Sequence, residues 1–274
     1  MEIKYLQASG FEAAFRGMRN PLNSWKKSDS TFGLGDQDLV YEIAADMVTH
    51  SESTISETDS VINSLVYDGI TQNSKTLTEY ALLGQNDLKL AQRLISAGPE
   101  HAKFLRQINI SFDLTAPLYF FKEFDTYKIG TTANSTSTMH KILSTPITRE
   151  MFEIDDYSEN LTTENGFIKD NIEDFLSFLE SLRLHSIALL EQSKQIDFTE
   201  AERKILAMES KKYWKELIRW LPEGLLQTRT ITMNYAVLRN IIKQRKNHKL
   251  TEWHTFINAM HALPYAKELI FYEL

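Results

Sequence analysis

Residues 131–138 (TTANSTST) concentrate side chains that can hydrogen-bond to a ligand, because six of these eight positions carry a hydroxyl. The flanking residues add Tyr127, Lys128 and His140. Hydroxyls, an amide and backbone donors in one segment are what a phosphate or the edge of a pyrimidine requires. The segment lies between apolar stretches. It is therefore either a solvated connector or a ligand-binding loop, and composition leaves both open.

A second candidate lies within 228–245, which the sequence predicts to be a strand followed by a helix. Asn234 and Arg245 are eleven residues apart, about three helical turns, so both lie on one side of the helix, as does Ile241. An arginine on an apolar stripe must either extend its head group to water or meet an anionic partner. The alternative is a favourable positive charge at the C-terminus of a helix.

Composition excludes several kinds of site. The chain has no cysteine, which excludes disulfides, thiolate metal sites and a cysteine nucleophile. His248 and His254 are six residues apart, a spacing that does not place both on one helix face, so we predict no metal site. The net charge of −7 argues against a nucleic-acid partner or an anionic membrane. No apolar stretch approaches about 18 residues and no secretory signal is evident, so we expect a cytoplasmic protein without a membrane span.

The helices and strands that must position these residues are predicted from the spacing of apolar residues along the sequence. Ile108, Ile110, Phe112 and Leu114 alternate with polar residues, which predicts a strand over 107–114 that ends at Pro117. Thr199 and Glu202 form a capping box for a helix, and Asn234 is a suitable N-cap for another. The remaining predicted elements are a strand over 226–233, a loop over 51–61, helices over 36–50, 77–96, 118–124, 169–192, 199–220 and 251–262, and a helix from 234 that ends near 245–249. Together they predict a single α+β domain covering residues 1–274.

Several of these residues follow one another along the chain in a particular order and spacing. Ala116-Pro117 and an aromatic stretch precede Thr132, Asn134 and Ser137, and Leu221-Pro222 precedes Thr232-Met233-Asn234, Asn240 and Arg245. In this order and spacing the chain resembles the flavin-dependent thymidylate synthases, whose motif is Arg-His-Arg-x-x-Ser-x-Asn-x-x-Ser-x-Arg-Tyr. The family also has Leu-Pro, then Thr-x-Asn, with Asn and Arg at +6 and +11. The resemblance covers 98–140 and 214–256, and segments of about 31–97 and 141–170 are interpreted as divergent insertions.

The resemblance implies a fold like that of the thymidylate synthase-complementing proteins, with a central, mostly antiparallel sheet and long helices. It implies a homotetramer with FAD at subunit interfaces, in which NADPH reduces the flavin and methylenetetrahydrofolate supplies carbon for C5 of dUMP or a related pyrimidine nucleotide. Arg245 would polarise the uracil ring, as electrostatic stabilisation of a developing anion. Cofactor contacts would come from His101, Tyr127, Lys128, Asn234 and Asn240. Substrate contacts would come from Glu123, Thr132, Asn134, Ser135, Ser137 and His140.

This sequence departs from the family pattern mainly at positions where the family has positively charged residues. Tyr127-Lys128-Ile129 stands in place of Arg-His-Arg, and Met139 and Ile218 stand where the family has arginines that hold phosphate. Each lost charge-assisted hydrogen bond is worth about 1.5–3 kcal/mol. Lys128, Arg219, Arg229 and Arg239 are neighbours that could compensate. Three hypotheses follow: a thymidylate synthase-like enzyme of the phage type, a non-catalytic relative that binds a nucleotide or a partner, and a pyrimidine hydroxymethylase.

Overall fold

The structure is a computed structural model, and it describes residues 1–35, 39, 42–43, 78–153 and 167–274. The described chain forms two compact units. We call Met1, Thr115–Phe124 and Ser135–Thr228 the helical unit, and Glu2–Leu114, Asp125–Asn134 and Arg229–Leu274 the sheet unit. Each is described by itself, and the single domain stays a prediction. The helix predicted over 36–50 lies almost wholly outside the described residues, and the loop over 51–61 lies entirely outside them.

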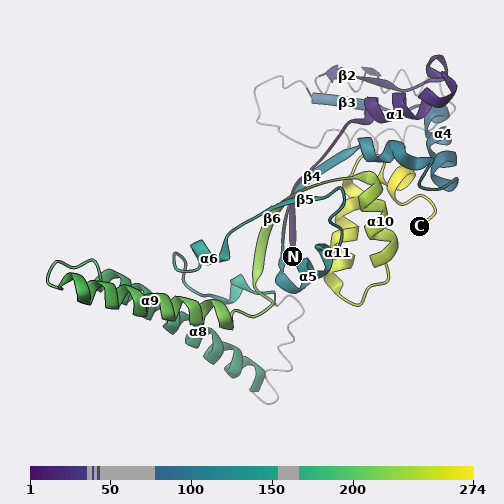
Figure 1. The fold of residues 1–274 in the computed structure, drawn as a ribbon. Coiled ribbons are helices and arrows are strands. Elements are labelled where there is room, and N and C mark those ends of the chain that lie inside the picture. The colour runs from purple at the N-terminus through teal and green to yellow at the C-terminus, as the bar shows by residue number, and fades with distance from the viewer. Residues whose placement is uncertain (36–38, 40–41, 44–77, 154–166) are drawn as a thin grey trace. The chain divides into compact units, whose positions relative to one another are not determined.

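A four-stranded sheet has the order β1-β4-β6-β5 (Figure 1). Its strands are β1 (Glu2–Ser9), β4 (Asn109–Pro117), β5 (Thr132–Ser135) and β6 (Leu226–Asn234). β4 and β6 are antiparallel, because the Tyr235 N–H donates to the Ile108 carbonyl at one end (3.0 Å) and the Leu118 N–H donates to the Leu225 carbonyl at the other (3.1 Å). The predicted α+β class with an antiparallel sheet is confirmed.

Alternation of side chains gives this sheet one buried and one polar face. Ile110, Phe112 and Leu114 of β4 are buried, as are Ile231 and Met233 of β6. On the other face Thr230 donates to Asp113 (2.6 Å), and the hydroxyls of Thr115 and Thr228 lie 2.7 Å apart. The period-two pattern read from the sequence is therefore the pattern of the sheet, and β4 continues as far as Pro117.

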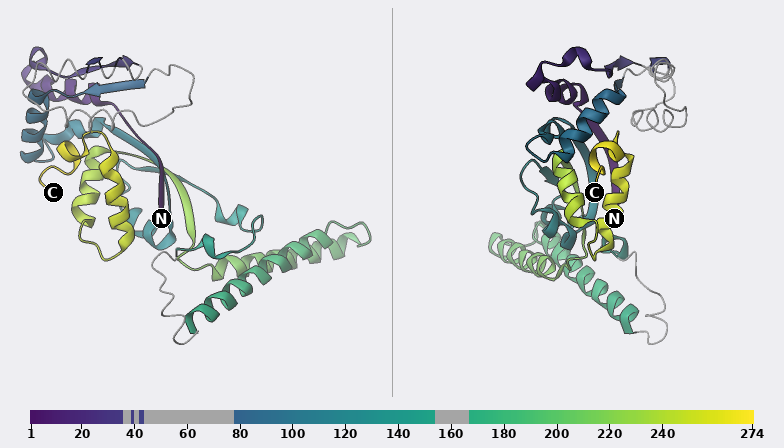
Figure 2. Two further views of the ribbon diagram at one scale, coloured as in Figure 1. Left: turned by 180° about the vertical axis from the view of Figure 1, so that it is seen from behind. Right: turned by 90° about the vertical axis from the view of Figure 1, so that its right-hand side faces the viewer.

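The sheet unit holds the larger part of this sheet, together with helices and a second, two-stranded sheet (Figures 1 and 2). They are α1 (Phe11–Arg19), α4 (Gln85–Ser96), α10 (Tyr235–Arg245) and α11 (Thr251–Ala259), with β2 (Thr31–Gly35) and β3 (Thr78–Leu82). The prediction of one helix over 77–96 was wrong in its first part. Residues 78–82 pair antiparallel with β2, from Thr31 opposite Leu82 to Gly35 opposite Thr78, and the helix begins only after Gly84.

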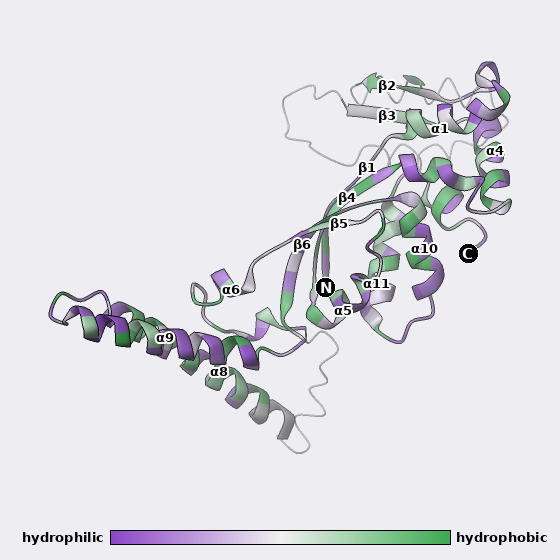
Figure 3. Ribbon diagram, in the orientation of Figure 1, coloured by the Kyte–Doolittle hydropathy of each residue, from purple (hydrophilic) through white to green (hydrophobic). Residues whose placement is uncertain are grey.

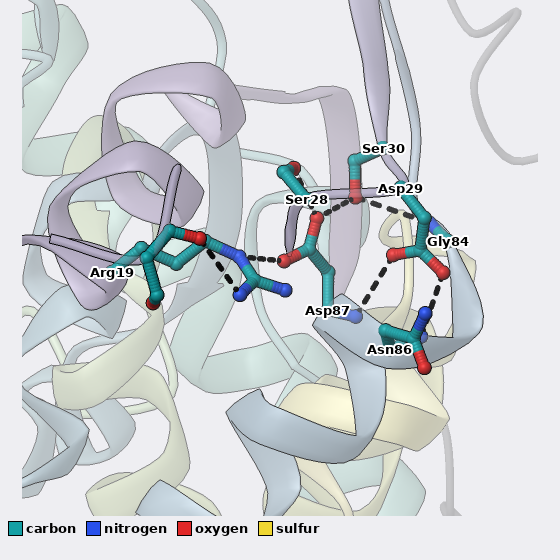
Figure 4. A network of polar contacts seen from close by, with 8 residues as sticks. Arg19, Ser28, Asp29, Ser30, Gly84, Asn86 and Asp87 are labelled. Carbon is teal, nitrogen blue, oxygen red and sulfur yellow. Dashed lines mark hydrogen bonds and ion pairs between the residues drawn. The ribbon is translucent and has the colours of Figure 1, made fainter. Parts of the chain in front are cut away.

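A buried ion pair joins α1 to α4 (Figure 4). The Nε of Arg19 donates to Oδ1 of Asp87 at 2.6 Å, and the two side chains are 5% and 0% exposed. Ser28 and Ser30 each donate to the other oxygen of Asp87, also at 2.6 Å. The Asp29 carboxylate accepts from the backbone N–H groups of residues 86 and 87, which supplies partners to the first turn of α4. This network fixes the 28–30 segment on α4.

Two long antiparallel helices dominate the helical unit. Its helices are α5 (Leu118–Phe124), α6 (Thr138–Lys141), α8 (Phe167–Gln192) and α9 (Glu200–Trp220). α8 and α9 lie side by side in every view of Figures 1 and 2. The predicted capping box is confirmed: Thr199 accepts from the Glu202 N–H, and the Glu202 carboxylate accepts from the Thr199 N–H at 2.8 Å.

In the described part of the chain, no helix is both long and apolar enough to cross a bilayer.

The core of the helical unit includes residues from the segment 141–153. The buried members of this cluster are Ile142, Ile147, Phe152, Leu179, Leu217 and Leu225. Phe152 also forms a backbone bridge with Leu225. The first part of the segment interpreted as a divergent insertion therefore contributes apolar side chains to the core rather than forming a solvated loop.

Candidate functional site

The junction of β6 and α10 forms as the sequence predicts. Asn234 ends the strand in an extended conformation, and its Oδ1 accepts from the Val237 N–H at 3.0 Å, which caps the helix. α10 is hydrophobic on one side and hydrophilic on the other (Figure 3), and its buried residues are Tyr235, Leu238, Ile241 and Ile242. The cap fixes where the helix starts, and the apolar side fixes its rotation, so Arg245 is set at a defined position in the last turn.

Arg245 is half-buried, and its guanidinium lies over two neighbouring aromatic rings. Its Nε donates to the Tyr127 hydroxyl at 2.8 Å. The guanidinium carbon is 4.9 Å from the centroid of the Trp253 ring and 5.6 Å from that of Tyr127, within the range of cation–π attraction. The sequence offered water, an anion or the helix C-terminus as the surroundings of this charge. The structure adds an aromatic contact that period and composition did not reveal.

The predicted residues of the sheet unit gather around the segment 127–134. A Cβ at Gly130 would lie 3.0 Å from Val237 and 3.4 Å from the amide nitrogen of Asn234, so this segment passes directly over the start of α10. The Tyr127 hydroxyl donates to Gln244 (3.2 Å), and Gln244 in turn donates to Oδ1 of Asn240 (3.0 Å). Tyr127, Asn234, Asn240 and Arg245 are thus brought to one place.

The hydroxyl-rich segment is not wholly the loop that its composition predicts. Residues 132–135 form β5 and residues 138–141 form α6, while the side chains of Thr132 and Asn134 are exposed on the strand. Lys128 is exposed before it. The hydroxyl oxygen of Thr131 is buried and has no hydrogen-bond partner among the described residues. Such an atom usually indicates a bound water or a ligand.

Glu123, Ser135, Ser137 and His140 belong to the helical unit. Glu123 is half-buried on α5, and Ser135 is exposed at the end of β5. The Ser137 hydroxyl accepts from the His140 N–H at 3.3 Å and lies 2.7 Å from Nδ1 of that ring. Ser137 and His140 are therefore in contact, but they lie in a different unit from Arg245.

His101 is exposed and precedes a 3-10 helix, Ala102–Gln107, that packs against α10. Its backbone N–H donates to the Gly98 carbonyl at 3.0 Å. Its imidazole makes no hydrogen bond or ring contact with the part of the chain that the structure covers. The structure therefore gives His101 a place near α10 without a side-chain link to Arg245.

The two positions where the family has phosphate-binding arginines have different surroundings here. Met139 is 53% exposed, and its carbonyl accepts from the Trp214 indole at 3.2 Å. Ile218 packs against the core of the helical unit. The three arginines that could compensate have protein partners: Arg219 pairs with Glu216, Arg229 with Asp125 (2.7 Å), and Arg239 donates to the Ile270 carbonyl (2.7 Å). Partial burial lowers the pKa of the Arg239 guanidinium.

Acidic and histidine side chains do not cluster as metal ligands. Across the described ranges, no group of three or more His, Asp or Glu residues is placed to hold a metal ion.

The fold is that of the flavin-dependent thymidylate synthases. One similar solved structure is flavin dependent thymidylate synthase ThyX from Helicobacter pylori complexed with FAD and dUMP, with a TM-score of 0.51, 15% identity and coverage of 98% of each chain. A second ThyX structure from Helicobacter pylori with FAD and dUMP has a TM-score of 0.50 and 16% identity, and covers 98% of this chain and 97% of that chain. No protein-family model and no curated protein matches the sequence. The likeness therefore lies in the fold.

Proposed function

We propose that this protein is an FAD-dependent, thymidylate synthase-like enzyme that transfers one carbon to C5 of a pyrimidine nucleotide, dUMP or a relative of it. The observation that carries the proposal is the placement of Arg245. A guanidinium that is half-buried, stacked on Trp253 and hydrogen-bonded to Tyr127 is a fixed positive charge beside the segment that leads to β5. A fixed charge of this kind can stabilise negative charge that develops on a pyrimidine ring.

The chemistry of the surrounding donors fits both a flavin and a uracil. The ring carbonyls of either molecule need N–H donors, which the amides of Asn234 and Asn240 and the guanidinium of Arg245 can provide. The buried hydroxyl of Thr131 needs a partner, which a ligand at this segment would provide. FAD, when bound, supplies the reducing equivalents for the transfer. The residues of this chain bind and orient the rings, with Tyr127, Lys128 and His101 on the cofactor and Thr132, Asn134, Ser135, Ser137, His140 and Glu123 on the nucleotide.

The proposed co-substrates follow from the resemblance to the flavin-dependent thymidylate synthases. NADPH is the proposed reductant and methylenetetrahydrofolate the proposed carbon donor, in a cytoplasmic homotetramer that places FAD at its subunit interfaces. The two similar ThyX structures contain FAD and dUMP, which supports the choice of cofactor and nucleotide.

Turnover tests this proposal directly. Purified protein is mixed with FAD, its visible flavin spectrum is recorded after dialysis, and the products formed from dUMP, methylenetetrahydrofolate and NADPH are identified by mass spectrometry. We expect retained flavin and a methylated nucleotide. Arg245→Ala should keep the flavin and lose turnover, whereas Arg16→Ala, an exposed arginine of α1, should keep both. Protein that retains no flavin, or that converts no pyrimidine nucleotide, would contradict the proposal. A hydroxymethylated product would identify the hydroxymethylase instead.

A second candidate is a non-catalytic relative that binds a nucleotide or a protein partner. Met139 and Ile218 favour it, because a solvent-exposed thioether and an aliphatic side chain packed against the core cannot hold a phosphate dianion. This candidate predicts that the Arg245→Ala variant keeps the protein's biological role. Loss of that role in the variant would exclude the non-catalytic candidate.

A further inference from the structure

The side chain of Arg245 is held by residues that come from three separate elements. Tyr127 lies in the segment that leads to β5, Gln244 lies in the last turn of α10, and Trp253 lies in α11. Trp253 is 0% exposed, and its ring makes edge contacts with Phe256 (5.9 Å between centroids) and with Tyr127 (6.3 Å). A ring packed in this way has no room to turn, so the guanidinium that stacks on it has a fixed platform.

The hydrogen bonds around Arg245 run in one direction. Nε of Arg245 donates to the Tyr127 oxygen, the Tyr127 hydroxyl donates to Oε1 of Gln244, and Nε2 of Gln244 donates to Oδ1 of Asn240. Tyr127 and Gln244 each accept one of these bonds and donate the next, and hydrogen bonds in such a chain polarise one another cooperatively. The relay ends on the amide oxygen of Asn240. This bond uses the amide oxygen of Asn240, and the amide nitrogen is the group that can donate to a ligand.

We propose that Tyr127, Gln244 and Trp253 are positioning residues that hold Arg245 and Asn240 as paired donors for the carbonyl oxygens of a bound ring. Tyr127 acts on Arg245 through its hydroxyl, which accepts from the Nε of Arg245. The geometric part stands without any assumption about activity, and the catalytic part rests on the proposed function. A guanidinium fixed before the substrate arrives needs no reorganisation as charge develops. A catalytic group displaced by about 1 Å can lose about 100-fold in rate.

The first experiment measures the geometry in protein without added ligand. The ¹H–¹⁵N resonance of the Arg245 Nε–H is assigned by its loss in Arg245→Lys. We expect a ring-current shift and slow exchange with water in the parent protein. Tyr127→Phe should speed that exchange by about tenfold or more, because it removes the acceptor. Trp253→Leu should remove most of the ring-current shift and Trp253→Phe should retain part of it, while Trp220→Leu, on the exposed side of α9, should change neither. An unshifted, rapidly exchanging resonance in the parent protein would overturn the proposal.

The second experiment measures turnover of dUMP with FAD, NADPH and methylenetetrahydrofolate. Trp253→Leu should lower kcat by about 100-fold while the KM for dUMP changes by less than about threefold, because the lost interaction acts on the transition state. Trp253→Phe should restore most of kcat. If Trp253→Leu does not fold, Tyr127→Phe replaces it, since that change removes one oxygen and leaves the packing. Unchanged kcat in both variants would refute the catalytic part. Absence of turnover in the parent protein would count against the proposed function, and the resonance measurement would still decide the geometric part.

Discussion

Removing the carboxylate of Asp87 should destabilise the sheet unit strongly. One oxygen of Asp87 accepts from the Arg19 guanidinium and the other accepts from Ser28 and Ser30, all at 2.6 Å, and the Asp87 side chain is fully buried (Figure 4). Asp87→Ala leaves the Arg19 charge buried without its partner, which costs about 3–5 kcal/mol. Two hydroxyls lose their acceptor as well, so we expect the upper half of that range.

The assay is chemical denaturation followed by circular dichroism, with thermal melting as a second measure. A loss of about 4 kcal/mol lowers the melting temperature by on the order of 10 °C in a chain of this size. The double variant Arg19→Met/Asp87→Leu should recover most of the loss, because well-packed apolar groups can replace a buried ion pair. Glu12→Gln removes an exposed contact with Arg16 and should cost less than about 0.5 kcal/mol. An Asp87→Ala variant within about 1 kcal/mol of the parent protein would refute the reasoning, because Arg19 would then have to be solvated.

Three further predictions concern caps and pH. Asn234→Ala removes the N-cap of α10 and should cost about 1 kcal/mol in thermal unfolding, with Asn234→Ser costing less; equal losses would contradict the cap. The Thr199 hydroxyl lowers the pKa of Glu202, so Thr199→Ala should raise that pKa toward its ordinary value in an NMR titration, and an unmoved titration would exclude the contact. The Arg183 guanidinium lowers the pKa of Glu180, so this pair stabilises the fold above the ordinary glutamate pKa and the contribution is lost as the pH falls through the lowered value. Glu180→Gln should therefore flatten the acid side of the stability profile, and an identical profile would rule out this contribution.

Local sequence patterns were sufficient to predict β4 and the junction of β6 and α10. The alternation of Ile110, Phe112 and Leu114 follows from burial on one face, and burial on one face is what the structure shows. Asn234 as the cap of α10 was also predictable, because both partners of that hydrogen bond lie within one turn. A signal of this kind needs only neighbouring residues, so one sequence contains it.

Contacts between distant parts of the chain were not predictable in the same way. Tyr127 and Arg245 are 118 residues apart, and no period relates them. Trp253 was placed in a predicted helix with nothing to indicate that its ring would stack on a guanidinium. Residues 78–82 were assigned to a helix because their partner strand, β2, lies far away in sequence. β5 was not predicted as a strand because all four of its residues are exposed. Polar composition indicates that side chains face solvent, but it does not indicate whether the backbone pairs with another strand.

The position of β5 at one end of the sheet order has a consequence for self-association. An edge strand has unpaired backbone N–H and C=O groups that can hydrogen-bond to a strand of a second molecule. Short, polar edge strands make such pairing less favourable. β5 has four residues and all four side chains are exposed and small, two of them hydroxyl-bearing. Replacing Thr132 or Asn134 with valine or isoleucine would make this edge a better template for aggregation. Alanine is therefore the replacement that separates lost ligand binding from precipitation.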